Sequence, residues 1–228
     1  MTIVRVVDLE TTGLEPPEAE VCEVGICDVD IESKSVLGQR SWLCGVRSMP
    51  PEVRAVHHIG LAECASHPAF DVTSLFAERV SVLAAHNSEF ETRFFRSPLP
   101  MLCTLKAALR VWPDAPSHSN GALRYWLEDA GKISLNDALT QPAHRAGPDA
   151  YVTAHIFLAL LAAGATGRDM VAWTREPPLL PRCPIGKFRG KPWAEVDAGF
   201  LGWMLRKEDM EEDLKWNARR EIDRRGQA

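Results

Sequence analysis

Long apolar runs are missing from this chain of 228 residues. No stretch approaches the roughly 20 apolar residues that a membrane-spanning helix needs. Residues 1–5 lack the basic and apolar segments of a signal peptide. The six cysteines include no Cys-x-x-Cys pair and no paired spacing of metal ligands. We therefore expect reduced core thiols in a cytoplasmic protein that has no membrane partner.

The sequence also lacks an excess of positive charge. Its 31 acidic residues outnumber its 26 basic residues, which gives a net charge of −5. This balance argues against a histone-like or ribosomal protein, but it leaves room for a nucleic-acid enzyme with a local site. The charge is uneven, because residues 181–228 carry 11 basic and 9 acidic residues while the rest of the chain is acidic.

Apolar runs rich in β-branched residues predict buried strands at residues 3–9 and 82–85, with two further strands at 21–30 and 35–43. Amphipathic or apolar patterns predict helices that open near Pro51 and Ser88 and helices at 72–80, 104–111, 120–129 and 149–163. This order of strands and helices predicts an α/β fold with a mixed sheet.

Glycine and proline gather between the long apolar helix and the C-terminal end of the chain. We interpret residues 166–182 as a linker between a domain at 1–165 and a small α+β module at 183–228. The module contains three tryptophans and ends in a helix of mixed charge, over residues 209–225, that we interpret as a solvated face.

Two carboxylates lie at the end of the first predicted strand. Asp8 and Glu10 are two residues apart, so in an extended strand their side chains point the same way. Two such charges repel each other and stay ionised most easily with a cation between them. Carboxylate oxygens suit hard Mg²⁺. The alternative is an acidic pair at a surface turn.

Two further segments carry residues suited to acid–base chemistry. His86, Asn87 and Glu91 follow the strand at 82–85. His144 lies five residues before Asp149, at the start of the long apolar helix. A histidine and a carboxylate so placed can face one pocket, and histidine is the usual general base near neutral pH.

Together these segments resemble the DnaQ-like (DEDDh) 3′→5′ exonucleases. Three family motifs occur in order: Asp8-Leu9-Glu10-Thr11-Thr12-Gly13, His86-Asn87-Ser88-Glu89-Phe90-Glu91 and His144 to Asp149. The resemblance implies a ribonuclease H-like fold, with a five-stranded mixed sheet flanked by helices. It also implies hydrolysis of phosphodiester bonds from a 3′ end with release of nucleoside 5′-monophosphates.

The resemblance also assigns roles to residues. It implies that Asp8, Glu10, Glu91 and Asp149 hold two Mg²⁺ ions, for which Mn²⁺ could substitute, and that His144 is the general base. It implies contacts to the terminal nucleotide from the following residues: Thr11, Thr12, Gly13, Leu14, His86, Asn87 and Phe90. Leu14 matches a position where the family places an apolar side chain against the terminal base, although a half-buried loop residue is an equal alternative.

Two positions depart from the family motifs. The family has Asp where this chain has Glu91, whose arm is longer by one methylene group. Glu91 either still serves the metal site or, as part of a Ser88-x-x-Glu91 capping box, has a mainly structural role with weakened catalysis. Pro148 disfavours helical geometry at the residue before it, so we expect the helix to begin at or after Pro148 and His144 to lie on a loop.

The C-terminal module interleaves basic and aromatic residues at Lys187, Phe188, Arg189 and Lys191. The three basic side chains are candidates for DNA contact, whereas the aromatic side chains are expected to form the core of the module.

The expected partner is DNA with single-stranded or duplex 3′ ends, in repair or recombination. Trimming of RNA 3′ ends is an alternative, because the motifs do not show whether the pocket accepts a 2′-hydroxyl group. A nucleic-acid-binding protein with a weakened site is another alternative, motivated by Glu91. A proofreading subunit bound to a polymerase is the last alternative.

Overall fold

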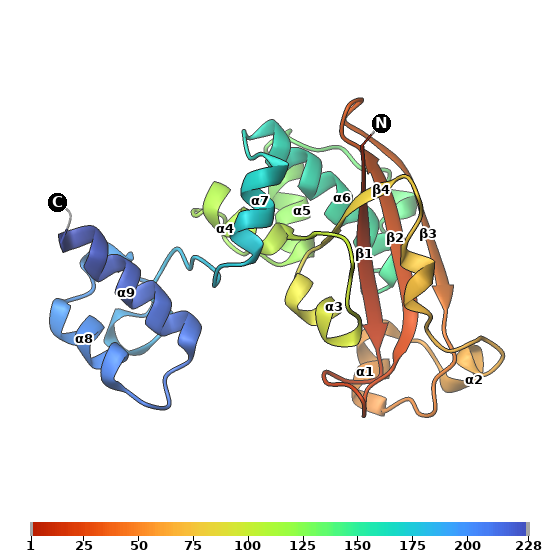
Figure 1. Ribbon diagram of the computed structural model, residues 1–228, viewed down its shortest axis with the longest axis horizontal. Coiled ribbons are helices and arrows are strands. Elements are labelled where there is room, and N and C mark those ends of the chain that lie inside the picture. The colour runs from red at the N-terminus through yellow and green to blue at the C-terminus, as the bar shows by residue number, and fades with distance from the viewer. Residues whose placement is uncertain (1, 227–228) are drawn as a thin grey trace.

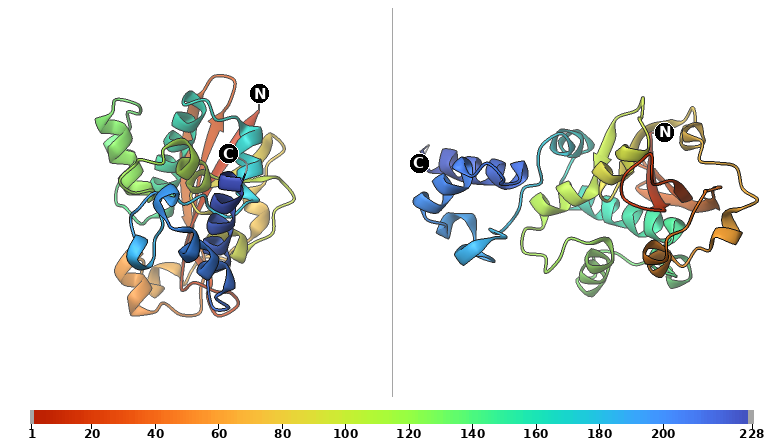
Figure 2. Two further views of the ribbon diagram at one scale, coloured as in Figure 1. Left: turned by 90° about the vertical axis from the view of Figure 1, so that its left-hand side faces the viewer. Right: turned by 90° about the horizontal axis from the view of Figure 1, so that it is seen from below.

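The structure, a computed structural model, describes residues 2–226. Figure 1 shows a twisted sheet with helices beside it and a smaller group of helices at the C-terminal end. An extended segment of chain joins the two parts, and the views in Figure 2 show the same separation.

The sheet has five strands in the order β3-β2-β1-β4-β5. Their bounds are β1 Ile3–Thr11, β2 Val21–Asp30, β3 Ser35–Leu43, β4 Val80–Ala85 and β5 Met101–Cys103. Strand β2 is antiparallel to both β1 and β3, whereas β4 is parallel to β1 and β5 is parallel to β4. The predicted mixed five-stranded sheet is confirmed, including the bounds of β2 and β3.

Nine α-helices lie within the described residues. Their bounds are α1 Pro51–His57, α2 Leu61–Cys64, α3 Ser88–Phe94, α4 Thr104–Val111, α5 Asn120–Asp129, α6 Ala146–Ala162, α7 Gly167–Thr174, α8 Ala198–Arg206 and α9 Glu212–Gly226. Short 3₁₀ turns occur at Val72–Leu75, Asp137–Leu139, Gly186–Phe188 and Trp193–Glu195. The helices predicted at 104–111 and 120–129 are confirmed to the residue.

Both faces of the sheet are buried at its centre, and the alternation along β1 decides what each face contacts. Val4 and Val6 share a core with Phe157 and Leu160 of α6. Ile3 and the other odd-numbered apolar residues of β1 pack in a second core on the opposite face, with Leu75 and Phe95. Because side chains alternate along a strand, residues 8 and 10 continue the row of Val4 and Val6 and point to the side where α6 lies.

Helix α6 approaches β2 closely at Gly25. A Cβ atom built on Gly25 would lie 2.0 Å from the carbonyl oxygen of Ala146, the first residue of α6. Only glycine fits this contact. The helix begins at Ala146, two residues earlier than expected. The expectation was wrong because amides in a first helical turn have no intrahelical partner, so Pro148 is tolerated there.

Three other expectations need correction. Residues 72–80 form a single 3₁₀ turn, Val72–Leu75, because Phe76 takes an extended backbone and its ring packs in the core. The stretch 166–182 contains helix α7, whose Met170 is buried in the main core, so the extended segment is shorter than predicted. The described residues of the module form helices but no strand, and Pro192 makes one isolated bridge to Arg182 just before the module, so the module is not α+β.

No single helix in residues 2–226 is long and apolar enough to cross a membrane. Helices α6 and α7 reach that length and composition only as a pair that is bent by 116°. Most of α6 is buried in the core of the sheet domain.

We predict that Gly25→Ala lowers the free energy of unfolding by about 3 kcal/mol, because the added methyl group displaces the start of α6. Chemical denaturation with circular dichroism measures the change. Gly121→Ala is the matched control, because a Cβ atom there meets nothing within 4 Å. It should stabilise α5 by up to about 1 kcal/mol. Equal effects of the two substitutions would contradict the close contact.

Candidate active site

Three carboxylates converge at the end of β1. Asp8 and Glu10 project from β1 toward α6, and Asp149 projects from the first turn of α6. One oxygen from each of the three carboxylates lies within 4.8 Å of the others. All three residues are partly buried. The structure therefore brings together three of the four predicted acidic residues, and we call Asp8, Glu10 and Asp149 the carboxylate cluster.

Glu91 lies beside the carboxylate cluster on α3. Its side chain is buried, with 4% of its surface exposed, and its Oε2 atom has no hydrogen-bond partner. Helix α3 begins after Asn87, and no side chain caps it. The capping-box interpretation of Glu91 is therefore wrong. A buried carboxylate oxygen without a donor is costly, and the nearby charges of Asp8 and Glu10 do not relieve it.

Burial and mutual repulsion raise the pKa values of all four carboxyl groups. Burial is the largest cause for each, and it raises the pKa of Glu10 and of Glu91 to about 8. The pKa of Asp8 lies well above its usual value, because burial is reinforced by the charges of Asp149, Glu91 and Glu10. Burial raises the pKa of Asp149 as well, although His144 opposes the shift.

These features fit a cation. Each carboxylate destabilises the ionised form of its neighbours, and a divalent ion among them would reverse that effect. All candidate ligand atoms are oxygens, which favours hard ions such as Mg²⁺ over softer metals. The unpartnered oxygen of Glu91 offers a fourth negative charge beside the cluster.

His144 lies on a loop, as predicted. Its backbone has φ of +58°, in the left-handed region, and its amide donates a hydrogen bond of 3.2 Å to Oδ2 of Asp149. The side chain is exposed. The loop therefore fixes the backbone of His144 against the carboxylate cluster while the imidazole faces solvent.

A partly buried ion pair, which no sequence motif indicated, anchors this loop. Glu23 of β2 lies opposite Glu10 in the sheet register and has 2% of its surface exposed. The guanidinium group of Arg145 donates two hydrogen bonds of 2.8 Å to Glu23, and the amide of Ala146 donates a third of 3.0 Å. The pairing depends on strand register and on the path of the loop, which no sequence motif reveals.

The end of β1 and the turn after it hold four of the seven residues predicted to contact a terminal nucleotide. Thr11 and Thr12 are buried, and both hydroxyl groups are hydrogen-bonded within the protein. The hydroxyl of Thr11 donates to the carbonyl of Gly13, and that of Thr12 accepts from the amide of Glu20. These side chains shape the turn. Leu14 has 70% of its surface exposed, so its side chain is free to contact a ligand.

In the second motif, His86 is held by hydrogen bonds within the protein, whereas Asn87 is exposed. Both ring nitrogens of His86 have protein partners, Thr104 Oγ1 at 3.0 Å and the carbonyl of His118 at 2.8 Å. Burial lowers the pKa of His86 to about 4, so its ring is neutral. The ring thus joins the end of β4 to α4 and has no nitrogen free for a substrate. Asn87 is exposed, and Phe90 packs against Phe94.

The basic turn of the module lies on its surface. Lys187 pairs with Asp197 at 3.1 Å and Lys191 pairs with Glu195 at 3.5 Å. Arg189 is exposed. The ring of Phe188 packs on Phe200 in the core of the module, so the prediction that this aromatic side chain is structural is confirmed.

A mixed sheet in this order, with converging acidic residues at the end of its central strand and a histidine on the adjoining loop, defines a nuclease of the ribonuclease H-like fold. The chain belongs to the exonuclease family, whose pattern it matches over residues 6–157.

Individual relatives extend the comparison. The chain is 29% identical to exodeoxyribonuclease 10 of Escherichia coli (strain K12) over 208 residues, which cover 89% of this chain and 90% of the relative. It is 30% identical to the DNA polymerase III subunit epsilon of Treponema pallidum (strain Nichols) over 171 residues, 68% of this chain and 74% of the relative. A solved structure of exonuclease X in complex with 5′ overhanging duplex DNA superposes with a TM-score of 0.64 at 28% identity, covering 75% of this chain and 99% of that chain.

We predict that the metal-free protein loses stability as the pH rises from 7 to 8. The folded state holds protons on Glu10 and Glu91 up to a pKa of about 8, whereas the unfolded chain releases them near 4.5. Stability therefore falls as the pH rises through this range. Melting temperatures in EDTA measure the effect.

In the same melting experiment, Glu10→Gln/Glu91→Gln should remove most of the difference between pH 7 and pH 8. Added Mg²⁺ should stabilise the parent protein more at pH 8 than at pH 7, because ligand carboxylates must lose their protons to bind the ion. Parallel curves for the parent and the double variant would contradict the assignment of these raised pKa values.

We predict that Glu23→Gln slows hydrolysis by roughly 10- to 100-fold per folded molecule, because Arg145 then no longer anchors the loop that carries His144. Asp28→Asn is the matched control. Asp28 also lies on β2 and receives two hydrogen bonds from a buried arginine, Arg5, but at the far end of the strand. Both variants should lower the melting temperature. A rate loss of the same size in both would show a general effect of stability.

Proposed function

We propose that this protein is a metal-dependent 3′→5′ exodeoxyribonuclease that releases nucleoside 5′-monophosphates from DNA 3′ ends. One observation carries the proposal: the carboxylate cluster and the buried, unpartnered Glu91 meet at the end of β1 in a chain of the exonuclease family. The similarity to exodeoxyribonuclease 10 over 89% of the chain supports DNA as the substrate.

Asp8, Glu10, Glu91 and Asp149 would hold two Mg²⁺ ions, with Mn²⁺ as a substitute. The chemistry that a pair of divalent ions supplies when bound is activation of water and stabilisation of charge on the leaving 3′-oxygen. Glu91 accommodates its longer arm by lying outside the carboxylate cluster, beside Asp8 rather than within the three-residue group.

His144 would accept the proton of the attacking water. Its backbone is held by Asp149 and by the ion pair of its neighbour Arg145, while its imidazole is exposed and free to turn toward a bound 3′ end. Leu14 would contact the terminal base, and backbone groups of residues 11–13 would hold the terminal nucleotide. The proposed setting is DNA repair or recombination in the cytoplasm, where six buried cysteines stay reduced.

The test is digestion of 3′-labelled single-stranded DNA, duplex DNA and RNA of one sequence with Mg²⁺, Mn²⁺ or EDTA. We expect labelled nucleoside 5′-monophosphates from DNA with Mg²⁺, less or none from RNA, and none in EDTA. Faster release from RNA would favour RNA trimming. Absence of release from every substrate with either metal would favour a binding protein with a weakened site.

Substitutions at Glu91 test its role in the same assay. Glu91→Asp should be at least as active as the parent, because it restores the family residue, whereas Glu91→Gln should lose roughly 100-fold because the charge is gone. Glu89→Gln is the matched control on the same helix, since Glu89 is exposed and pairs with Lys106. Loss of activity in Glu91→Asp would contradict the assignment of this position.

A further inference from the structure

Helix α9 has two faces of different character. Its inner face packs on the core of the module through Leu214, Asn217, Ala218 and Glu221, all of which are buried. The inner face also fixes the helix at its C-terminal end, where Arg225 donates to the carbonyl groups of residues 193, 194 and 196. The helix is therefore held rigidly in the module.

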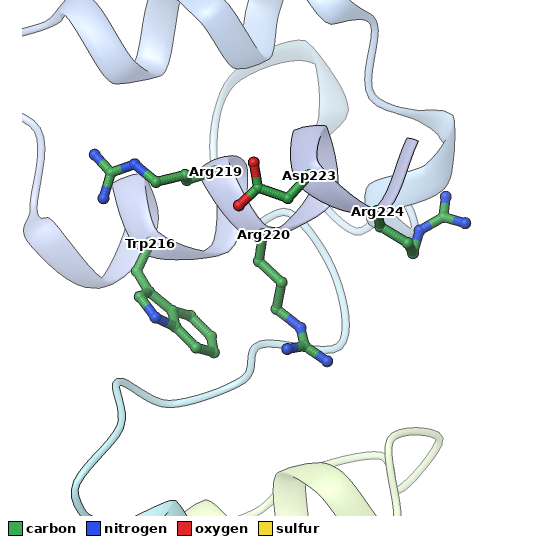
Figure 3. Close-up of a pocket in the computed structure, with 5 residues that line it drawn as sticks. All are labelled: Trp216, Arg219, Arg220, Asp223 and Arg224. Atoms are coloured by element: carbon green, nitrogen blue, oxygen red, sulfur yellow. The ribbon is translucent and has the colours of Figure 1, made fainter. Parts of the chain in front are cut away.

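The outer face presents one aromatic residue and three arginines. Trp216, Arg219, Arg220, Asp223 and Arg224 follow the spacing of one helical stripe and line a shallow hollow of about 400 Å³. Figure 3 shows the side chains of Trp216 and Arg220 leaving the helix on the same side. We call these five residues the α9 outer face.

Two arginines of the α9 outer face have no acidic partner. Within residues 2–226, no carboxylate oxygen lies within 4.0 Å of Arg219 or Arg220. The guanidinium group of Arg220 lies 5.7 Å from the centre of the Trp216 ring. Arg224, in contrast, donates a hydrogen bond to Glu221 of the inner face. With Asp223 included, the α9 outer face carries a charge of +2.

Many other cations of the module are paired. The following lie within 4.0 Å of a carboxylate: Lys187, Lys191, Lys207, Lys215 and Arg225. The turn that the sequence favoured for DNA contact thus has two of its three charges engaged. Four basic side chains among the described residues of the module have no carboxylate partner. Two of them, Arg219 and Arg220, are adjacent on α9 beside the partly exposed indole ring of Trp216.

This chemistry matches a nucleic-acid strand. Guanidinium groups bind phosphates through paired hydrogen bonds, and an indole ring stacks on a base without regard to its identity. The stripe runs over nine residues, from Trp216 to Arg224, so its ends lie about 12 Å apart along the helix. That length covers roughly three successive phosphates of one strand.

We propose that the α9 outer face binds the phosphate backbone of the DNA strand whose 3′ end is hydrolysed, with Arg219 and Arg220 on phosphates and Trp216 stacked on a base. The inference rests on the proposed function for the identity of the ligand. It replaces the interpretation of the terminal helix as a merely solvated face.

The test is binding of the full chain to a fluorescent 30-nucleotide single-stranded DNA in EDTA, followed by anisotropy over a series of KCl concentrations. We expect Arg219→Gln/Arg220→Gln to bind at least tenfold more weakly at low salt. The slope of log K against log salt should fall by about 1.4, since each phosphate contact on a single strand contributes ~0.7. Trp216→Ala should weaken binding by roughly tenfold, and Trp216→Phe should restore most of it.

The matched control is Lys34→Gln/Arg168→Gln. It removes the same charge from the end of the sheet that lies opposite the carboxylate cluster. Lys34 lies in the turn between β2 and β3, and Arg168 lies beside Thr2 and Ile31. Both residues are exposed. Melting curves confirm that each variant folds. Equal affinity and equal salt slope for the α9 variant and this control would overturn the inference.

Hydrolysis separates this inference from the proposed function. With Mg²⁺, the Arg219→Gln/Arg220→Gln variant should show a raised KM for DNA and an unchanged kcat. If the parent hydrolyses DNA and the variant has an unchanged KM, the α9 inference fails alone. If the parent hydrolyses no DNA but the variant loses affinity, the proposed function fails and the α9 inference stands.

Discussion

Repulsion among Asp8, Glu10, Asp149 and Glu91 is the constraint on which the rest of the structure depends. Burial raises the pKa values of all four carboxyl groups, and the charges of neighbouring carboxylates raise those of Asp8, Glu10 and Glu91 further. Without tertiary structure, the three segments that carry these groups would move apart. Here the two apolar cores on the faces of the sheet fix β1, and the long apolar helix α6 brings Asp149 to the end of that strand. The stability of the cores opposes the repulsion at the site.

The ion pair of Glu23 and Arg145 places a positive charge beside the carboxylate cluster. The buried carboxylate of Glu23 lies opposite Glu10 and adds to the repulsion, but the guanidinium group of Arg145 pairs with it and opposes the rise in the pKa of Glu10. The arginine is thus both a tether for the loop and a fixed positive charge beside the cluster. The ion pair gives Glu23 a structural role, in contrast to the three residues of the carboxylate cluster, which are candidate ligands for a cation.

Local patterns predicted much of this structure, and tertiary contacts decided the rest. The alternation at residues 3–9 placed Asp8 and Glu10 on one face, and the ordered motifs placed Asp149 with them. Pro148 misled the prediction of where α6 begins, because its tolerance depends on which amides lack partners. Phe76 ended a predicted helix by packing in the core. Strand β5 has only three residues, and it is recognised through its pairing with β4.

Surface charge was the hardest property to predict. Basic residues at 187–191 and on the terminal helix look alike in sequence, and their counter-ions differ only once the chain is folded. Trp216 and the arginines three and four residues later share one face because the helix is continuous through them. The position of Leu14 on an exposed turn could be predicted from its motif, whereas the engagement of both His86 nitrogens could not.

The missing side chain at Gly25 has an electrostatic consequence. Because the backbone of β2 touches Ala146, the first turn of α6 lies directly against the edge of the sheet that carries the carboxylates. The aligned peptide dipoles of a helix place about half a positive charge at its N-terminus. That partial charge lies beside Asp149, and the amide of Ala146, which has no partner within the helix, donates a hydrogen bond to Glu23. A single hydrogen atom in place of a side chain thus lets a helix of 17 residues bring its positive end to a site crowded with negative charge.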